Sequence, residues 1–243
     1  MLFRSAERWL FWHRRDLRLA DNLGLAAAAA ATPALTGVFV LDPAILGASD
    51  MAPARVWFLL ESLAELQQRW RQAGSRLIVL EGDPAVVLPQ LAEALHAPVV
   101  AWNRDVEPYG RARDRQVAAQ LQAAGRKVLV DWDQLLVAPE ALKTGAGDPY
   151  RVYGPFWRNW RGQVEQGDAT GALALRPAPS GLLDLEQPLP AHLPVLEALP
   201  TAAALGQSFD GADLCPCRPG EAAAQAQLQA FCEDRKSTRL NSS

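Results

Sequence analysis

The chain has 243 residues, 49% hydrophobic and 21% charged, so it is long enough to bury a substantial core in one or two domains. Its formal net charge of −3 gives no general attraction to nucleic acid, so composition alone does not indicate a DNA-binding protein. No apolar run reaches the roughly 18–20 residues that span a bilayer, and residues 1–8 lack the apolar core of a signal peptide, so we expect a cytoplasmic protein.

The first 130 residues alternate strand-like and helix-like stretches. Strand-like runs lie at 8–12, 36–41, 76–80, 98–102 and 127–130, and helical patterns at 21–31, at 53–73, from 84 onward and at 108–124. Asp21 is placed to cap the first helix, Pro84 suits a first helical position, and Gly74 and Gly125 suit helix ends.

This alternation predicts an α/β fold over residues 7–135. We expect a five-stranded, parallel, doubly wound sheet of the Rossmann-like or flavodoxin-like kind, with helices on both faces and right-handed crossovers. Ligands of such sheets bind at the carboxyl ends of the strands, near the point where the strand order reverses. The positions to inspect therefore follow Trp12, Leu41 and Trp102.

The rest of the chain has a different composition. Residues 136–218 include a long stretch rich in Pro, Gly, Ala and Leu, which indicates a mostly irregular interdomain linker that wraps a surface. Residues 219–233 start a helix with nothing left to pack against, which we interpret as the truncated start of a further, helical domain. Residues 234–243 read DRKSTRLNSS and resemble the translation of a sequencing adapter, so we interpret them as non-native.

Several common kinds of site find no support. The three cysteines, Cys215, Cys217 and Cys232, are odd in number and clustered, which argues against a disulfide framework. Cys215 and Cys217 lack a second ligand pair for zinc, so free thiols are favoured and no metal is expected. Neither a G-x-G-x-x-G fingerprint nor a P-loop follows the first strand, which argues against a dinucleotide dehydrogenase and an NTPase.

A series of short motifs carries a family resemblance. They are FWHRRDLRL at 11–19, MAPAR at 51–55, GDP at 82–84, WNRDVEPYG at 102–110, WDQ at 132–134, YGPFW at 153–157 and PGE at 219–221. In this order and spacing they are similar to the DNA photolyase and cryptochrome family, over nearly everything before Asp234. The resemblance is closest to the N-terminal antenna domain of class I photolyases of the 8-hydroxy-5-deazaflavin type, cut before the FAD-binding domain.

The resemblance implies an antenna pigment at the carboxyl edge of the sheet. The pigment favoured is 8-hydroxy-5-deazaflavin, with a folate or FMN as alternatives. Arg55 follows the second strand and Asp105 and Glu107 follow the fourth, so we expect one cation and two carboxylates to converge on one cleft. The walls would come from His13, Phe39, Val40, Leu41 and Tyr109, with Trp12 beside them.

Plainer readings of the same residues stay open. His13 could be a hydrogen-bonded core histidine, and Arg55, Asp105 and Glu107 could be ordinary loop charges. Asp16 and Arg18 are interpreted as a structural salt-bridge cluster at the turn after the first strand. Among the tryptophans, Trp12, Trp57, Trp70 and Trp102 are expected in the core and pocket walls, and Trp157 and Trp160 against an absent domain.

For the full-length protein the resemblance implies repair of cyclobutane pyrimidine dimers in UV-damaged DNA. The damaged base would be flipped out beside FAD, whose light-driven electron transfer splits the dimer. This fragment would keep only the antenna part, with no catalytic residue of its own, and is expected to be a monomer that is inactive alone. The alternatives are a cryptochrome-type blue-light photoreceptor and a free-standing flavodoxin-like nucleotide-binding module.

Overall fold

The computed structural model describes residues 7–211, 215 and 217–240, and in that part of the chain it contains one five-stranded sheet. The strands are β1 (Trp9–His13), β2 (Leu35–Leu41), β3 (Leu77–Glu81), β4 (Val99–Asn103) and β5 (Lys127–Asp131). The helices are α1 (Leu23–Ala31), α2 (Pro43–Leu46), α3 (Pro53–Gln72), α4 (Pro84–Ala94), α5 (Pro108–Ala123), α6 (Tyr153–Ala169) and α7 (Glu221–Leu240), with a 3₁₀ turn η1 (Pro139–Ala141). None of the described helices is both long and apolar enough to cross a bilayer.

All strand pairs are parallel, in the order β3-β2-β1-β4-β5. The α/β fold class with its five-stranded parallel sheet is therefore confirmed. Of the two related arrangements, this strand order is the Rossmann-like one. β1 lies in the middle, β2 and β3 follow on one side of it, and β4 and β5 follow on the other. The loops that follow β1 and β4 thus leave the sheet side by side at the switch point.

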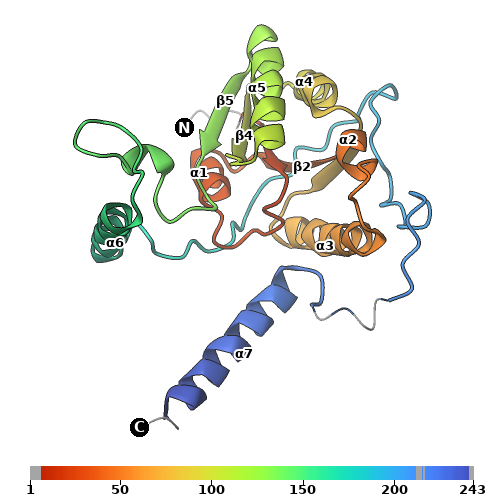
Figure 1. The fold of residues 1–243 in the computed structure, drawn as a ribbon. Helices are drawn as coiled ribbons and strands as arrows, with labels where there is room; N and C mark the ends of the chain where they lie inside the picture. Colours follow the sequence, from red (N-terminus) through yellow and green to blue (C-terminus); the bar gives the residue numbers. More distant parts are fainter. Residues whose placement is uncertain (1–6, 212–214, 216, 241–243) are drawn as a thin grey trace.

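Helices cover both faces of the sheet (Figure 1). Alternation along β1 sends Leu10 and Trp12 into the core beneath α4 and α5, and sends Phe11 to the core beneath α1 and α3. The inner strands are therefore buried between two hydrophobic layers, one on each face of the sheet. The edge strand β5 is only partly covered.

The N-terminus of α1 differs from the sequence-based expectation. Asn22, not Asp21, is the N-cap, and its side-chain oxygen accepts a hydrogen bond from the Leu25 amide at 3.0 Å. Asp21 instead has a left-handed backbone with φ 50°, and its amide donates to the Arg176 carbonyl at 2.7 Å. A linker contact from far along the sequence thus fixes the residue that local propensity favoured as the cap.

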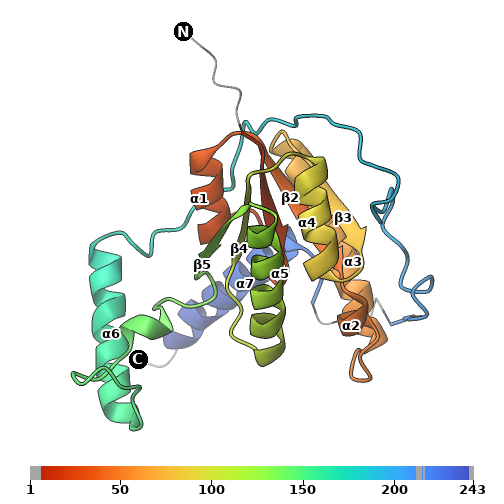
Figure 2. The same cartoon turned by 90° about the horizontal axis from the view of Figure 1, so that it is seen from above.

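The segment after β5 contains more regular structure than the sequence indicated. Helix α6 continues to Ala169, where irregular chain was expected from about residue 162. Figures 1 and 2 show α6 apart from the sheet, and it buries no residue of its own. It is held instead to the preceding loop, through bonds such as Gln163 Nε2 to the Ala141 carbonyl at 2.8 Å.

Beyond α6 the linker wraps the sheet domain as expected. Its backbone pairs with the open edge at β3, where the Glu81 amide donates to the Pro194 carbonyl at 3.0 Å and the Leu196 amide to the Val79 carbonyl at 2.8 Å. Leu182 and Leu193 are buried against the two core layers. Covering β3 in this way removes an exposed sheet edge.

Helix α7 projects from the domain and is anchored at its first residue (Figure 1). The Glu221 carboxylate is buried, accepts hydrogen bonds from the Leu19 and Ala20 amides at 2.8 and 3.1 Å, and lies 3.2 Å from Arg69 Nε. The helix runs to Leu240, so the prediction that its regular pattern ends near residue 233 is wrong. The interpretation of residues 234–243 as non-native stays a prediction.

Candidate functional site

The largest described cavity, about 660 Å³, lies where the loops after β1 and β2 meet the start of α3. We call it the β1–α3 cavity. Its mostly apolar lining comprises Trp12, Leu17, Phe39, Val40, Ile45, Met51, Ala54, Phe58, Leu59 and Pro84, with His13 in the floor and Cys215 and Cys217 on the linker side. A cavity of this size and position fits the general rule for ligands of parallel α/β sheets.

The polar groups around this cavity are mainly cationic. Arg14, Arg15, Arg55 and Arg113 line it, against the single carboxylate of Asp42. Arg14 and Arg113 already pair with Asp114, and both guanidinium groups lie 5.0 Å from the Trp12 ring.

Arg55 differs from these neighbours because its guanidinium makes no hydrogen bond or ion pair with any residue that the structure describes. It is exposed near the start of α3. An unpaired guanidinium beside an apolar cavity can form a charge-assisted bond to an anionic oxygen of a ligand.

His13 is fully buried and both ring nitrogens are occupied. Trp70 Nε1 can only donate, so His13 Nε2 accepts from it at 3.0 Å, and Nδ1 carries the proton and donates to the Asp16 carbonyl at 2.9 Å. Burial lowers the pKa of the imidazole, which therefore stays neutral. His13 forms the floor of the cavity as a hydrogen-bonded core histidine, with no exposed surface for a ligand.

Asp105 and Glu107 do not line this cavity. Asp105 is buried, accepts from the Glu107 amide at 3.0 Å, and lies 3.8 Å from Arg15 and 3.9 Å from Arg113. Glu107 is exposed and pairs with Arg15 at 2.7 Å. Arg15 thus stands between the two carboxylates and the cavity, and a direct ligand role for Asp105 and Glu107 stays a prediction.

The remaining wall candidates divide between the core, the cavity lining and the first turn of α5. Leu41 is buried in the layer beneath α1 and α3, away from the cavity lining, whereas Phe39 and Val40 do line the cavity. The Tyr109 hydroxyl donates to Asp42 Oδ2 at 2.8 Å, and burial together with this bond raises the pKa of Tyr109 to about 12. Tyr109 therefore stays protonated and connects the first turn of α5 to the loop after β2.

The structural role expected for Asp16 is carried by a buried polar network at the switch point, whose other members the sequence did not indicate. Asp16 accepts hydrogen bonds from Asn103 Nδ2 at 2.7 Å, Asn22 Nδ2 at 3.1 Å and the Arg14 amide at 2.9 Å. Arg18 pairs not with Asp16 but with Asp133 at 2.8 Å. The sequence showed that polar residues follow β1 and β4, but it did not show their bonding partners, which come from distant segments.

Metal binding finds no support in the described part of the chain, where no three His, Cys, Asp or Glu side chains cluster as ligands. The tryptophan expectations hold in part: Trp12, Trp70 and Trp102 are fully buried. Trp157 is exposed on α6 and lies against Arg161.

Comparisons with known proteins point to one family. The family model for DNA photolyase matches residues 9–179. The chain is 53% identical to a deoxyribodipyrimidine photo-lyase of Synechococcus sp. (strain ATCC 27144 / PCC 6301) over 226 residues, 92% of this chain and 45% of that protein. The chain therefore spans about half the length of the curated photo-lyase that it matches.

Solved structures agree with the fold. A bacterial class III photolyase from Agrobacterium tumefaciens superimposes with a TM-score of 0.74 and 29% identity, over 94% of this chain and 45% of that one. A cryptochrome from Synechocystis sp. PCC6803 gives a TM-score of 0.72 and 25% identity, over 95% of this chain and 47% of that one.

Proposed function

Because the chain belongs to the DNA photolyase family, we propose that it is the light-harvesting part of a deoxyribodipyrimidine photo-lyase. The whole protein would repair cyclobutane pyrimidine dimers in UV-damaged DNA. FAD would be held by sequence outside this chain, since the chain covers only 45% of its photo-lyase relative. This part would act in the first stage, the capture of light.

The observation that supports the proposal is the pairing of an apolar cavity with an uncommitted cation. The β1–α3 cavity of about 660 Å³ has room for a planar ring system, and Phe39, Val40 and Phe58 supply apolar surface for its faces. Arg55 would bond an anionic oxygen at the rim. Among the candidate pigments we favour 8-hydroxy-5-deazaflavin, because an ionised ring hydroxyl is the group that Arg55 would stabilise.

Protein side chains would hold and shield the pigment. A bound pigment supplies light absorption and passes the excitation to FAD, whose electron transfer splits the dimer. His13, locked by Trp70 and Asp16, keeps the floor rigid and neutral. Arg14 and Arg113, already paired with Asp114, add positive potential without being free to move.

The test is a pigment titration of this chain and two variants. The titrants are 8-hydroxy-5-deazariboflavin, 5,10-methenyltetrahydrofolate and FMN, followed by absorbance and fluorescence. Arg55→Gln removes the free charge, and we expect it to weaken deazaflavin binding about tenfold or more, the effect of losing one charge-assisted bond. Arg71→Gln is the matched control, since Arg71 is also exposed on α3 but far from the cavity.

Two results would contradict the proposal. One is failure of all three pigments to bind, and the other is binding of the deazaflavin to Arg55→Gln with parental affinity. Tighter binding of the folate or FMN than of the deazaflavin would replace the pigment but keep the antenna role. Light-dependent repair by this chain with FAD alone would contradict the assignment of catalysis to sequence outside it.

A further inference from the structure

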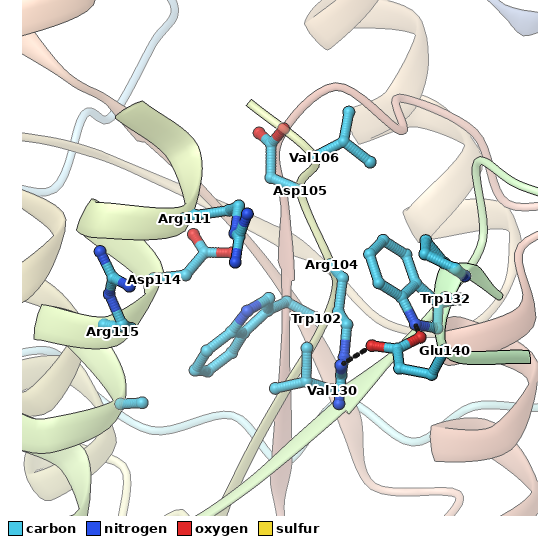
Figure 3. A pocket seen from close by; sticks show the side chains of 12 residues that line it. Trp102, Arg104, Asp105, Val106, Arg111, Asp114, Arg115, Val130, Trp132 and Glu140 are labelled. Atoms are coloured by element: carbon cyan, nitrogen blue, oxygen red, sulfur yellow. Dashed lines mark hydrogen bonds and ion pairs between the residues drawn. The ribbon is translucent and has the colours of Figure 1, made fainter. Parts of the chain in front are cut away.

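A second cavity, of about 500 Å³, lies on the opposite side of the switch point (Figure 3). We call it the β5-edge cavity. It is enclosed by α5, by the ends of β4 and β5, and by the loop that carries Trp132 and Glu140. It shares only Asp105 with the small polar cavity beside Arg15 and no residue with the β1–α3 cavity.

Trp102 forms the inner wall of the β5-edge cavity and carries an unused donor. Its side chain is 1% exposed, and its indole Nε1 has no hydrogen-bond partner among the described residues. Figure 3 shows the ring lying across the space between α5 and Val130. Buried donors are nearly always paired, so an orphaned N–H in a residue that lines a cavity is a position where an acceptor from outside the chain, a water or a ligand atom, can bond.

The rim of the same cavity carries uncommitted positive charge. Arg111 and Arg115 lie one turn apart on α5, both are exposed, and neither side chain bonds any residue in the described ranges. All three acidic groups of the lining already have cationic neighbours. Asp114 pairs with Arg14, and Glu140 with Arg104 at 3.2 Å. Asp105 lies 3.8 Å from Arg15 and 3.9 Å from Arg113. The excess charge at the rim therefore favours an anion.

The outer wall is a rigid aromatic surface. Trp132 Nε1 donates to Glu140 at 2.9 Å, and the Arg104 guanidinium lies 5.3 Å from the Trp132 ring centroid. Trp132, Val130 and Pro139 thus give the cavity apolar surface suited to a flat ring, with the edge of the buried Trp102 behind it.

We propose that the β5-edge cavity binds a small planar heteroaromatic molecule that carries a phosphate or carboxylate group. A ring nitrogen or carbonyl oxygen accepts from Trp102 Nε1, the ring packs against the apolar part of the lining, and Arg111 and Arg115 bind the acidic group. The proposal does not depend on the antenna function, because it uses none of the residues of the β1–α3 cavity.

The test uses two probes, AMP for a phosphate and quinoline-2-carboxylate for a carboxylate, with adenosine as the uncharged comparison. Binding is followed by calorimetry and by the ¹H–¹⁵N signals of the tryptophan indoles, with Trp102→Phe identifying the Trp102 signal. We expect at least one anionic probe to bind with a millimolar or lower dissociation constant and to shift the Trp102 indole signal. Adenosine should bind at least about tenfold more weakly than AMP if AMP is the probe that binds.

Variants locate the site and keep the test independent of folding damage at Trp102. The double variant Arg111→Gln/Arg115→Gln should weaken the bound probe about tenfold or more, since two charge-assisted contacts are lost. The double variant Arg71→Gln/Arg158→Gln removes the same charge from exposed positions outside this cavity and should bind like the parent. Arg55→Gln should also bind the probe like the parent, which separates this site from the β1–α3 cavity.

Three outcomes would overturn the proposal. The first is that neither anionic probe binds below about 10 mM, a dissociation constant equivalent to a standard free energy of only roughly −3 kcal/mol. The second is that a probe binds without moving the Trp102 indole signal. The third is that Arg55→Gln, and not the α5 double variant, abolishes binding.

Discussion

Substitution of Asn103 by Ala should destabilise the domain more than any surface change, because Asn103 joins three segments in the core. Its side chain is buried at the end of β4. Nδ2 donates to Asp16 Oδ2 at 2.7 Å and to Asn22 Oδ1 at 2.9 Å, and Oδ1 accepts from the Gly24 amide at 3.2 Å. These bonds connect β4 to the turn after β1 and to the start of α1.

The magnitude follows from the number and kind of bonds. A bond to a charged group contributes about 1.5–3 kcal/mol and a neutral bond about 1 kcal/mol, so the three together give roughly 3.5–5 kcal/mol. Water that enters the vacated space would recover part of this, so we expect Asn103→Ala to lower the free energy of unfolding by about 3 kcal/mol. For a domain of this size that is a fall in Tm of roughly 6–12 °C.

Urea and thermal denaturation, followed by circular dichroism, measure the change. Gln116→Ala is the control, because Gln116 is exposed on α5 and has no side-chain bond within the described residues. A loss below about 1 kcal/mol for Asn103→Ala would refute the reasoning, since it would mean that the network contributes no more than one ordinary hydrogen bond.

Two further predictions concern His13 and Glu221. Burial lowers the folded-state pKa of His13, so the neutral imidazole's contribution to stability is complete above about pH 6.5 and is lost as pH falls below that value. The free energy of unfolding should change by at most about 1.4 kcal/mol per pH unit from this group. Urea unfolding between pH 5 and 7.5 should show this slope in the parent and not in His13→Phe, and equal slopes would contradict the prediction. Glu221→Ala removes the acceptor of the Leu19 and Ala20 amides, so these two amides should exchange hydrogen faster. Helix α7 should also become sensitive to protease, while the Tm of the domain changes by less than about 4 °C. Unchanged exchange at both amides would show that α7 is anchored elsewhere.

Local patterns were sufficient to predict the sheet domain, because each of its elements carries its own signal. The five apolar strand patterns, the prolines that start α3, α4 and α5, and the positive-φ glycines at 74 and 125 are all short-range features. Elements whose form depends on distant contacts were predicted less well. Asp21 is not the N-cap of α1, because its amide bonds the Arg176 carbonyl and its backbone is left-handed. Helix α6 is held by the preceding loop and has no buried face of its own.

The sequence indicated where polar residues gather at this edge of the sheet, but not which of them pair with one another. That polar residues would gather after β1, β2 and β4 followed from the parallel sheet alone. Which of them pair could not follow, because Arg14 bonds Asp114 and Arg18 bonds Asp133, each more than 90 residues away. These long-range pairs neutralise the charges of the turn after β1, whereas the Arg55 guanidinium has no ion pair among the described residues.

The switch-point rule places the ligand crevice between the loops after β1 and β4, and the polar network explains why the two large cavities lie to either side of that point. Asp16, Asn22 and Asn103 fill the space directly at the reversal and leave there only a polar cavity of about 120 Å³. Since that network fixes both loops, the larger openings form over β1 and β2 on one side and over β4 and β5 on the other. Loosening the network should therefore disturb both cavities together, whereas Arg55 and Arg111 each act on one alone.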